Sequence, residues 1–283
     1  MANVLQIEKP LVSVNWLYQH KDAINLIILD ATIPKVTQNK SSSVLEENQI
    51  PNARFFDIKK TFSIGEAAFP NTAVPPRDFE KEARKLGVTI NSCIVVYDTH
   101  GIYSSPRVWW LFRTMGFTNV AVLDGGFPAW KKANYPIEKK QTKEVEFGDF
   151  KASFEAKKIA DLEIVLDSIK NQSKQIVDAR SKGRFNATEP EPRKEVRSGH
   201  IPTSTNLPFQ TILNTTQLKK KEELKLLFKE VNPDSKEMIF SCGSGITACV
   251  LALGASIAGH NEIAVYDGSW TEWGSLTHLP IEK

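Results

Sequence analysis

The chain has 283 residues, of which 41% are hydrophobic and 24% charged, with 36 Lys and Arg against 33 Asp and Glu. This length accommodates two hydrophobic cores more readily than one, and the even charge balance argues against a nucleic-acid-binding protein, although it allows a local basic pocket for a small anion. The three cysteines exclude a disulfide framework and indicate a reducing compartment, and the lack of CxxC or HxxxH spacing argues against a metal site.

The N-terminal segment and the hydropathy pattern predict where the protein resides. Residues 1–20 lack a charged start followed by an apolar stretch, so they do not resemble a secretory signal. No apolar run approaches the ~20 residues that cross a bilayer. We therefore expect no membrane partner, with the cytoplasm as the default compartment and the mitochondrion as the alternative.

Four stretches in the first half resemble four in the second half, in the same order. "LIILDA" pairs with "QIVDAR", "QIPNARFFD" with "HIPTSTNLPF", "CIVVYDTHG" with "EMIFSCGSG", and "VLDGGFPAW" with "VYDGSWTEW". The offsets lie between 143 residues, from Asp124 to Asp267, and 151 residues, from Pro51 to Pro202. A nearly constant offset over four landmarks indicates two copies of one domain.

Within each copy, short apolar runs alternate with longer amphipathic segments. In the second copy, "IVDA" and "MIFSC" predict buried strands, residues 215–231 space their leucines at a helical period, and residues 247–259 predict a buried helix. This alternation predicts an α/β fold with a parallel sheet and helices on both faces. We place the domains at residues 1–135 and 159–283, with the charge-rich residues 136–158 as a linker.

Cys242 is the strongest candidate for chemistry. It follows the run "MIFS" and precedes a Gly-Ser-Gly turn and a helix, which is where open α/β sheets bind ligands. Inward-facing amides of such a turn and the positive end of the helix favour a thiolate, the nucleophilic form of cysteine. Cys93 opens a strand and Cys249 lies in an apolar helix, so we expect both to be core residues. A resolving role for Cys249 is the less favoured alternative.

Three other nucleophile motifs do not match this loop. A cysteine phosphatase needs an Arg at the sixth position after the cysteine, where this chain has Ala248. A serine-hydrolase elbow needs glycines two residues before and after Ser244, and those positions hold Cys242 and Ile246. A P-loop would close with Gly-Lys-Ser or Gly-Lys-Thr, which is lacking here.

The whole pattern resembles the rhodanese sulfurtransferases, through two tandem copies, "DAR" and "GHIP" in the second copy, and a six-residue loop that begins with cysteine. The loop "CGSGIT", Cys242–Thr247, and "GRFNATEPEPR", Gly183–Arg193, look like the branch that acts on 3-mercaptopyruvate. The thiosulfate branch usually carries a charged loop of the "CRKGVT" type. The resemblance covers almost the entire chain and implies two rhodanese domains, each a five-stranded parallel sheet flanked by helices.

The resemblance also implies roles for individual residues. Cys242 would accept sulfur as a persulfide and pass it to a small thiol, a thioredoxin or cyanide, with no metal or organic cofactor. Arg184 and Arg193 would hold the carboxylate and keto oxygen of the substrate, which suits a planar guanidinium. The remaining substrate-binding residues would be those of the loop: Gly243, Ser244, Gly245, Ile246 and Thr247.

The first copy differs from the second at the catalytic position. It has Asp98 where the second copy has Cys242, and because an aspartate cannot form a persulfide, we expect the first copy to be catalytically silent. A proton relay proposed for the family uses an Asp and a His. Asp57 matches the Asp as an auxiliary candidate, but residues 70–76 carry Asn71 or Thr72 in place of the His.

Two alternatives stay open. The first is a thiosulfate:cyanide sulfurtransferase, against which the neutral Gly243-Ser244 pair argues, since thiosulfate would gain from a cation in the loop. The second is a non-enzymatic rhodanese-fold binding module, against which the intact cysteine loop argues.

Overall fold

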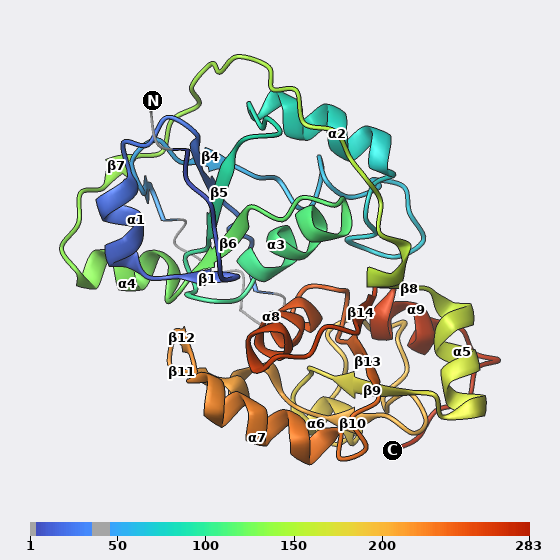
Figure 1. Cartoon of the computed structure of the whole chain (residues 1–283). Coiled ribbons are helices and arrows are strands. Elements are labelled where there is room, and N and C mark those ends of the chain that lie inside the picture. Colours follow the sequence, from blue (N-terminus) through green and yellow to red (C-terminus); the bar gives the residue numbers. More distant parts are fainter. Residues whose placement is uncertain (1–3, 36–45) are drawn as a thin grey trace. The chain divides into compact units, whose positions relative to one another are not determined.

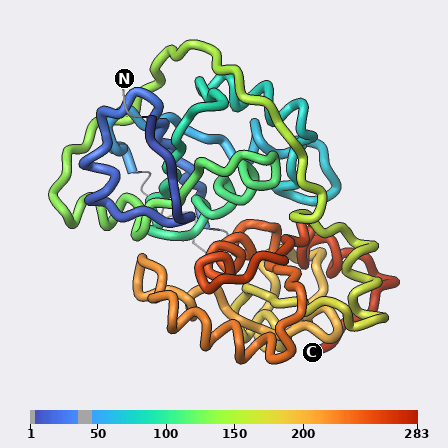
Figure 2. Tube along the Cα trace, in the orientation of Figure 1, coloured from blue at the N-terminus to red at the C-terminus, as the bar shows by residue number. Residues whose placement is uncertain are grey.

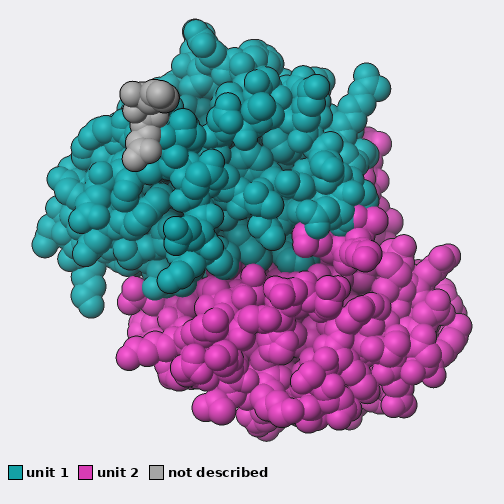
Figure 3. Space-filling model, in the orientation of Figure 1, with its two compact units in different colours: residues 1–63, 73–155 teal, residues 64–72, 156–283 magenta. Residues whose placement is uncertain are grey.

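The computed structural model describes residues 4–35 and 46–283, and these divide into two compact units. One unit comprises the described residues within 1–63 and 73–155, and the other comprises residues 64–72 and 156–283 (Figure 3). Each unit is built around its own five-stranded sheet (Figure 1). Among the described residues, no helix is both long and apolar enough to cross a bilayer.

The sheet of the first unit is entirely parallel. Its strand order is β1-β6-β5-β2-β4, with β1 at Leu11–Val12, β2 at Leu26–Asp30, β4 at Arg54–Phe55, β5 at Cys93–Tyr97 and β6 at Val120–Leu123. Helices α1 (Val14–His20) and α4 (Gly126–Lys132) pack Leu17, Phe127 and Trp130 into one core cluster with Tyr97. Helices α2 (Pro76–Lys85) and α3 (Ser105–Thr114) contribute to a second, aromatic cluster.

The sheet of the second unit repeats this arrangement. Its order is β10-β9-β13-β14-β8, with β8 at Ile159–Ala160, β9 at Lys174–Asp178, β10 at Thr205–Asn206, β13 at Glu237–Ser241 and β14 at Ile263–Tyr266. On one face, Ile239 packs with side chains of α5 (Leu162–Asn171) and α9 (Ser269–Ser275). On the other face, Phe240 contacts Phe228 of α7 (Lys221–Val231), against which α8 (Ala248–Ala258) packs.

The two units confirm the predicted repeat. Read from the opposite edge, the second sheet runs β8-β14-β13-β9-β10, and each of these strands is the counterpart of one strand in β1-β6-β5-β2-β4. The two copies follow one another along the Cα trace, the first from blue to green and the second from yellow to red (Figure 2). The predicted α/β fold with five-stranded parallel sheets is therefore confirmed.

Short elements complete the chain. They are β3 (Asn48–Gln49) paired antiparallel with β7 (Glu138–Lys139), β11 (Leu213–Asn214) paired antiparallel with β12 (Gln217–Leu218), α6 (Lys182–Phe185), and two 3₁₀ turns at Ala156–Lys158 and Phe209–Ile212. The β11–β12 hairpin shortens the helix expected over residues 215–231, which begins only at Lys221. The helix expected over residues 247–259 is present as α8 and ends at Gly259, whose φ of +106° is the left-handed conformation of a helix C-cap.

The segment predicted to be a linker packs largely onto the first unit. Strand β7 pairs with β3, and further along Phe150 is buried among Phe79, Phe112 and Phe117. The backbone of Phe150 also bonds Val88, and its carbonyl accepts from the side chain of Arg84. The charge-rich composition of this segment conceals these buried anchor points.

We predict that Phe150→Ala destabilises the first unit by about 3–5 kcal/mol, because truncation leaves a cavity in an aromatic cluster. Phe147→Ala is the matched control, since Phe147 lies in the same segment with 74% of its side chain exposed, and its effect should stay within about 0.5 kcal/mol. Urea unfolding of the two variants measures both effects, and equal midpoints would contradict the packing described here.

Candidate functional site

The loop Cys242–Thr247 lies between the end of β13 and the start of α8. The side chain of Cys242 is buried, with 1% of its surface exposed. Gly245 adopts a φ of +75°, a left-handed conformation that glycine takes without a steric penalty. The strand-turn-helix order predicted for this loop is therefore present, with the thiol at the carboxyl end of the central strand.

The N-terminus of α9 holds this loop in place. The hydroxyl oxygen of Ser269 accepts hydrogen bonds from the amides of Cys242 at 3.2 Å and Gly245 at 3.1 Å. The next two amides, of Trp270 and Thr271, donate to the carbonyls of Cys242 and Gly243 at 3.0 and 2.9 Å. The Thr271 hydroxyl also donates to the Gly243 carbonyl. These contacts fix the backbone on both sides of the Cys242 thiol.

Ser269 is a site residue that the sequence analysis missed. Its φ of +49° matches the φ of +53° at Gly126, which occupies the corresponding place in the first copy. A left-handed conformation costs a non-glycine residue about 1–3 kcal/mol, so the serine is retained there at the expense of stability. The change from "DGG" in the first copy to "DGS" in the copy with the cysteine is the signal that could have identified it.

Several amides of the loop are available to a ligand. Across the described part of the chain, the amides of Gly243, Ser244, Ile246 and Thr247 donate to no protein acceptor. These residues flank Cys242 and precede a helix. Such consecutive amides form a site for negative charge.

The corresponding turn of the first unit shows an anion in this position. Asp98 follows β5, and its carboxylate accepts hydrogen bonds from four backbone amides at 2.9 Å, those of His100, Tyr103, Ser104 and Ser105. The Ser105 hydroxyl adds a fifth at 2.8 Å. Like Gly245, Gly101 within this turn has a positive φ. In the first unit the turn thus directs its amides toward the side chain that follows the central strand.

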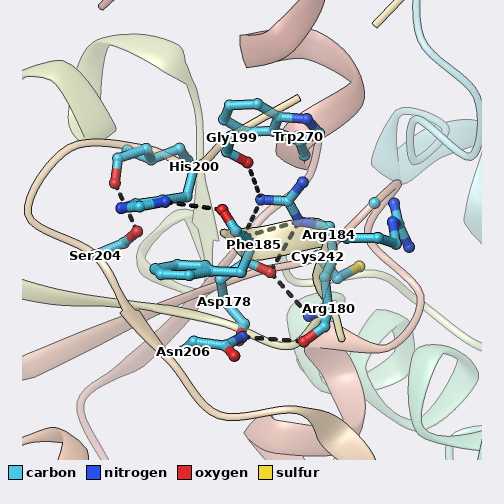
Figure 4. Close-up of polar contacts among 12 residues, drawn as sticks. Asp178, Arg180, Arg184, Phe185, Gly199, His200, Ser204, Asn206, Cys242 and Trp270 are labelled. Carbon is cyan, nitrogen blue, oxygen red and sulfur yellow. Dashed lines mark hydrogen bonds and ion pairs between the residues drawn. The ribbon is translucent and has the colours of Figure 1, made fainter. Parts of the chain in front are cut away.

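A buried cation organises the segments beside the loop. The fully buried guanidinium of Arg180 donates to both carboxylate oxygens of Asp178 and to the carbonyl of Gly199 at 2.8 Å (Figure 4). It also donates to Glu191 at 2.8 Å. The guanidinium also lies over the ring of Trp270, with its Cζ atom 4.4 Å from the ring centroid. Burial alone would lower the pKa of Arg180, but the carboxylates of Asp178 and Glu191 outweigh it and raise the pKa.

Of the two predicted substrate arginines, Arg184 approaches the loop directly, and Arg193 is linked to it through Thr271. Glu191 accepts from Arg184 at 3.1 Å and 2.5 Å, so one carboxylate joins Arg180 to Arg184. A Cβ atom at Gly243 would lie 3.1 Å from Nη2 of Arg184, so the glycine permits this close approach. Arg193 donates to the Thr271 hydroxyl at 3.3 Å, and Thr271 in turn bonds Gly243.

The other candidate cysteines and Asp57 have surroundings of their own. Burial raises the pKa of Cys93 to about 12, which keeps its thiol protonated and unreactive. Cys249 is buried in α8, where its thiol donates to the carbonyl of Gly245 at 3.3 Å. Asp57 belongs to the first unit and accepts from the amides of Lys59 and Lys60; its auxiliary role stays a prediction. Within residues 4–35 and 46–283, no group of three or more His, Cys, Asp and Glu could hold a metal ion.

Comparisons with known proteins agree with this geometry. Mouse (Mus musculus) 3-mercaptopyruvate sulfurtransferase is 40% identical over 278 residues, covering 95% of this chain and 93% of the relative. Thiosulfate/3-mercaptopyruvate sulfurtransferase 1, mitochondrial, from Arabidopsis thaliana is 36% identical and covers 97% and 78%. The crystal structure of SseA from Escherichia coli, a 3-mercaptopyruvate sulfotransferase, is 32% identical with a TM-score of 0.82 and covers 93% and 99%.

The family model for the rhodanese-like domain matches the chain twice. The matches cover residues 13–133 and 161–276, which are the two copies that the internal repeat predicts. Each match includes four of the five strands of one sheet, all but the edge strand β1 or β8, and the turn after the central strand. The chain therefore belongs to the rhodanese family, with two rhodanese domains in tandem.

Proposed function

We propose that this protein is a sulfurtransferase that takes sulfur from 3-mercaptopyruvate through a persulfide on Cys242, releases pyruvate, and passes the sulfur to a small thiol, a thioredoxin or cyanide. The observation that carries the proposal is the set of unengaged amides around the Cys242 thiol, with the Arg184 guanidinium against Gly243. The names of the mouse and Escherichia coli relatives support the choice of donor. The cytoplasm is the proposed compartment, with the mitochondrion, named for the Arabidopsis relative, as the alternative.

The first step forms the persulfide. The Cys242 thiolate attacks the sulfur of 3-mercaptopyruvate, and the electron pair of the carbon–sulfur bond moves to carbon, leaving the enolate of pyruvate. The proton of the substrate thiol ends on the methyl carbon, so the products are pyruvate and an anionic persulfide. Arg184 and Arg193 hold the carboxylate and keto oxygen, which brings the donor sulfur toward the thiolate.

The second step depends on the loop. The amides of Gly243, Ser244, Ile246 and Thr247 stabilise the outer sulfur of the persulfide, as the amides of the first unit stabilise the carboxylate of Asp98. The acceptor then attacks that outer sulfur, and the Cys242 thiolate leaves. The chemistry needs no further group, because the electrons of the broken S–S bond return to Cys242.

A thiosulfate sulfurtransferase is the nearer alternative, and the name of the Arabidopsis relative includes both donors. The loop contains neither Lys nor Arg, which favours the singly charged 3-mercaptopyruvate over the doubly charged thiosulfate. The ratio of kcat/KM for the two donors decides between them, and a preference for thiosulfate would overturn the proposed donor.

A non-enzymatic binding module is the more distant alternative. It predicts no change in intact mass when the protein is incubated with 3-mercaptopyruvate. The enzyme predicts a gain of one sulfur atom, removed again by a thiol or by cyanide.

We predict that Cys242→Ser abolishes pyruvate release from 3-mercaptopyruvate, because a hydroxyl cannot accept the sulfur. Cys249→Ser is the matched control, since Cys249 lies in the same segment but is packed into α8, and it should keep most of the activity. Pyruvate is measured in a coupled assay, and full activity of Cys242→Ser would refute the assignment.

We predict that Glu191→Gln weakens both folding and substrate binding. The amide leaves the buried guanidinium of Arg180 with less compensating charge, which should lower the free energy of unfolding by about 3 kcal/mol. Arg184 loses its fixed orientation, so KM for 3-mercaptopyruvate should rise about tenfold. Glu189→Gln is the control, because Glu189 is exposed and its side chain bonds only Ser181 among the described residues. Similar effects in both variants would contradict this role of Glu191.

A further inference from the structure

Nine residues from the first half of the chain belong to the second unit. Residues 64–72 leave the first unit between Ser63 and Ala73, which pair as an isolated antiparallel bridge. The amide of Ile64 donates to the carbonyl of Thr72 at 2.9 Å, which joins the two ends of this segment. Near its end lies Asn71, with a φ of +64°. Asn, Asp, His and Gly are the residues that adopt this conformation most readily.

Asn71 contacts the cysteine loop directly. Its side-chain nitrogen donates to the hydroxyl oxygen of Ser244 at 2.9 Å and to the carbonyl oxygen of Ser244 at 3.1 Å. An amide nitrogen is a donor only, so the Ser244 oxygen accepts and its own proton points elsewhere. Among the residues that the structure describes, no protein acceptor takes that proton. Ser244 is 5% exposed and lies two residues from Cys242.

We infer that Asn71 is a positioning residue, which turns the O–H of Ser244 toward the substrate oxygen that becomes negative when the carbon–sulfur bond breaks. This inference rests on the proposed function and deepens it. The keto oxygen of 3-mercaptopyruvate becomes the enolate oxygen, and a fixed donor in a buried site stabilises that developing charge. Ser244 would touch the substrate, whereas Asn71 acts through Ser244.

This arrangement does not require Asn71 to transfer a proton during the reaction. The proton that converts the enolate to pyruvate comes from the substrate thiol, and Ser244 donates only a hydrogen bond. Neither side chain titrates in the accessible pH range, so Asn71 donates and the Ser244 oxygen accepts at every pH. The direction of this hydrogen bond would reverse if residue 71 were a carboxylate. The carboxylate would accept from the Ser244 hydroxyl, whose proton would then no longer face the substrate.

The experiment compares Asn71→Asp with Asn71→Gly, both compatible with the left-handed backbone. Asn71→Gly removes the donor and should lower kcat about tenfold, with little change in KM. Asn71→Asp turns the Ser244 proton away and should lower kcat by about 100-fold or more, the cost of one lost oxyanion donor. At acid pH the aspartate is protonated and donates again, so the ratio of kcat in Asn71→Asp to kcat in the natural chain should rise.

Two further variants make the result specific. Ser244→Ala should lose as much kcat as Asn71→Asp. The double variant of Asn71→Asp with Ser244→Ala should lose no more kcat than either single variant, because both changes remove the same hydrogen bond to the substrate. Thr72→Ala is the control, since its hydroxyl donates to the Phe69 carbonyl, and it should retain the natural kcat. Urea midpoints verify folding; if Asn71→Asp does not fold, the cycle of Asn71→Gly with Ser244→Ala replaces it.

The outcomes separate the two hypotheses. If the natural chain releases no pyruvate from 3-mercaptopyruvate, the proposed function fails. If it releases pyruvate but Asn71→Asp and Asn71→Gly lose equal activity at all pH values, or their losses add to that of Ser244→Ala, Asn71 serves only the structure and the inference is overturned.

Discussion

The buried guanidinium of Arg180 is the interaction on which the geometry of the second unit's site depends. It binds Asp178 at the end of β9, the "EPEPR" segment through Glu191, and α9 through Trp270. Each of these partners leads to the site: Glu191 holds Arg184, and the backbone of Trp270 holds Cys242. A neutral side chain could not join three segments in this way, because buried carboxylates need an opposite charge and hydrogen-bond donors beside them.

The turn after the central strand is similar in the two copies, but the side chain at its start differs. In each, the turn after the central strand contains a glycine with a positive φ, Gly101 or Gly245. In the first copy the Asp98 carboxylate accepts hydrogen bonds from the amides of the turn, which stabilises the turn. In the second copy Cys242 takes this place, and the amides of Gly243, Ser244, Ile246 and Thr247 donate to no protein acceptor among the described residues. In the proposed function these amides stabilise the persulfide.

The sequence predicts the features that local patterns encode. Periodicity reports burial, so the central strands, α8 and the repeat could be predicted, and the turn chemistry identifies Cys242. The contact between Asn71 and Ser244 joins residues 173 positions apart and leaves no local pattern. The role of Ser269 depends on a left-handed backbone that composition does not reveal. The hairpin at residues 213–218 interrupts a helical spacing of leucines because tertiary packing outweighs propensity there.

The balance of charge at the site bears on the choice of donor. Arg180 is neutralised by Asp178, and the Nε and Nη2 edge of Arg184 is occupied by Glu191. The loop itself adds no cation, so the stabilisation of a persulfide comes from amide dipoles, which act over a short range. A donor with one carboxylate needs one guanidinium edge, and in the proposed function Arg193 or the remaining edge of Arg184 supplies it. Thiosulfate places two charges close to the reacting sulfur, where this loop offers neutral dipoles alone. The same pairing that fixes the arginines thus supports 3-mercaptopyruvate as the preferred donor.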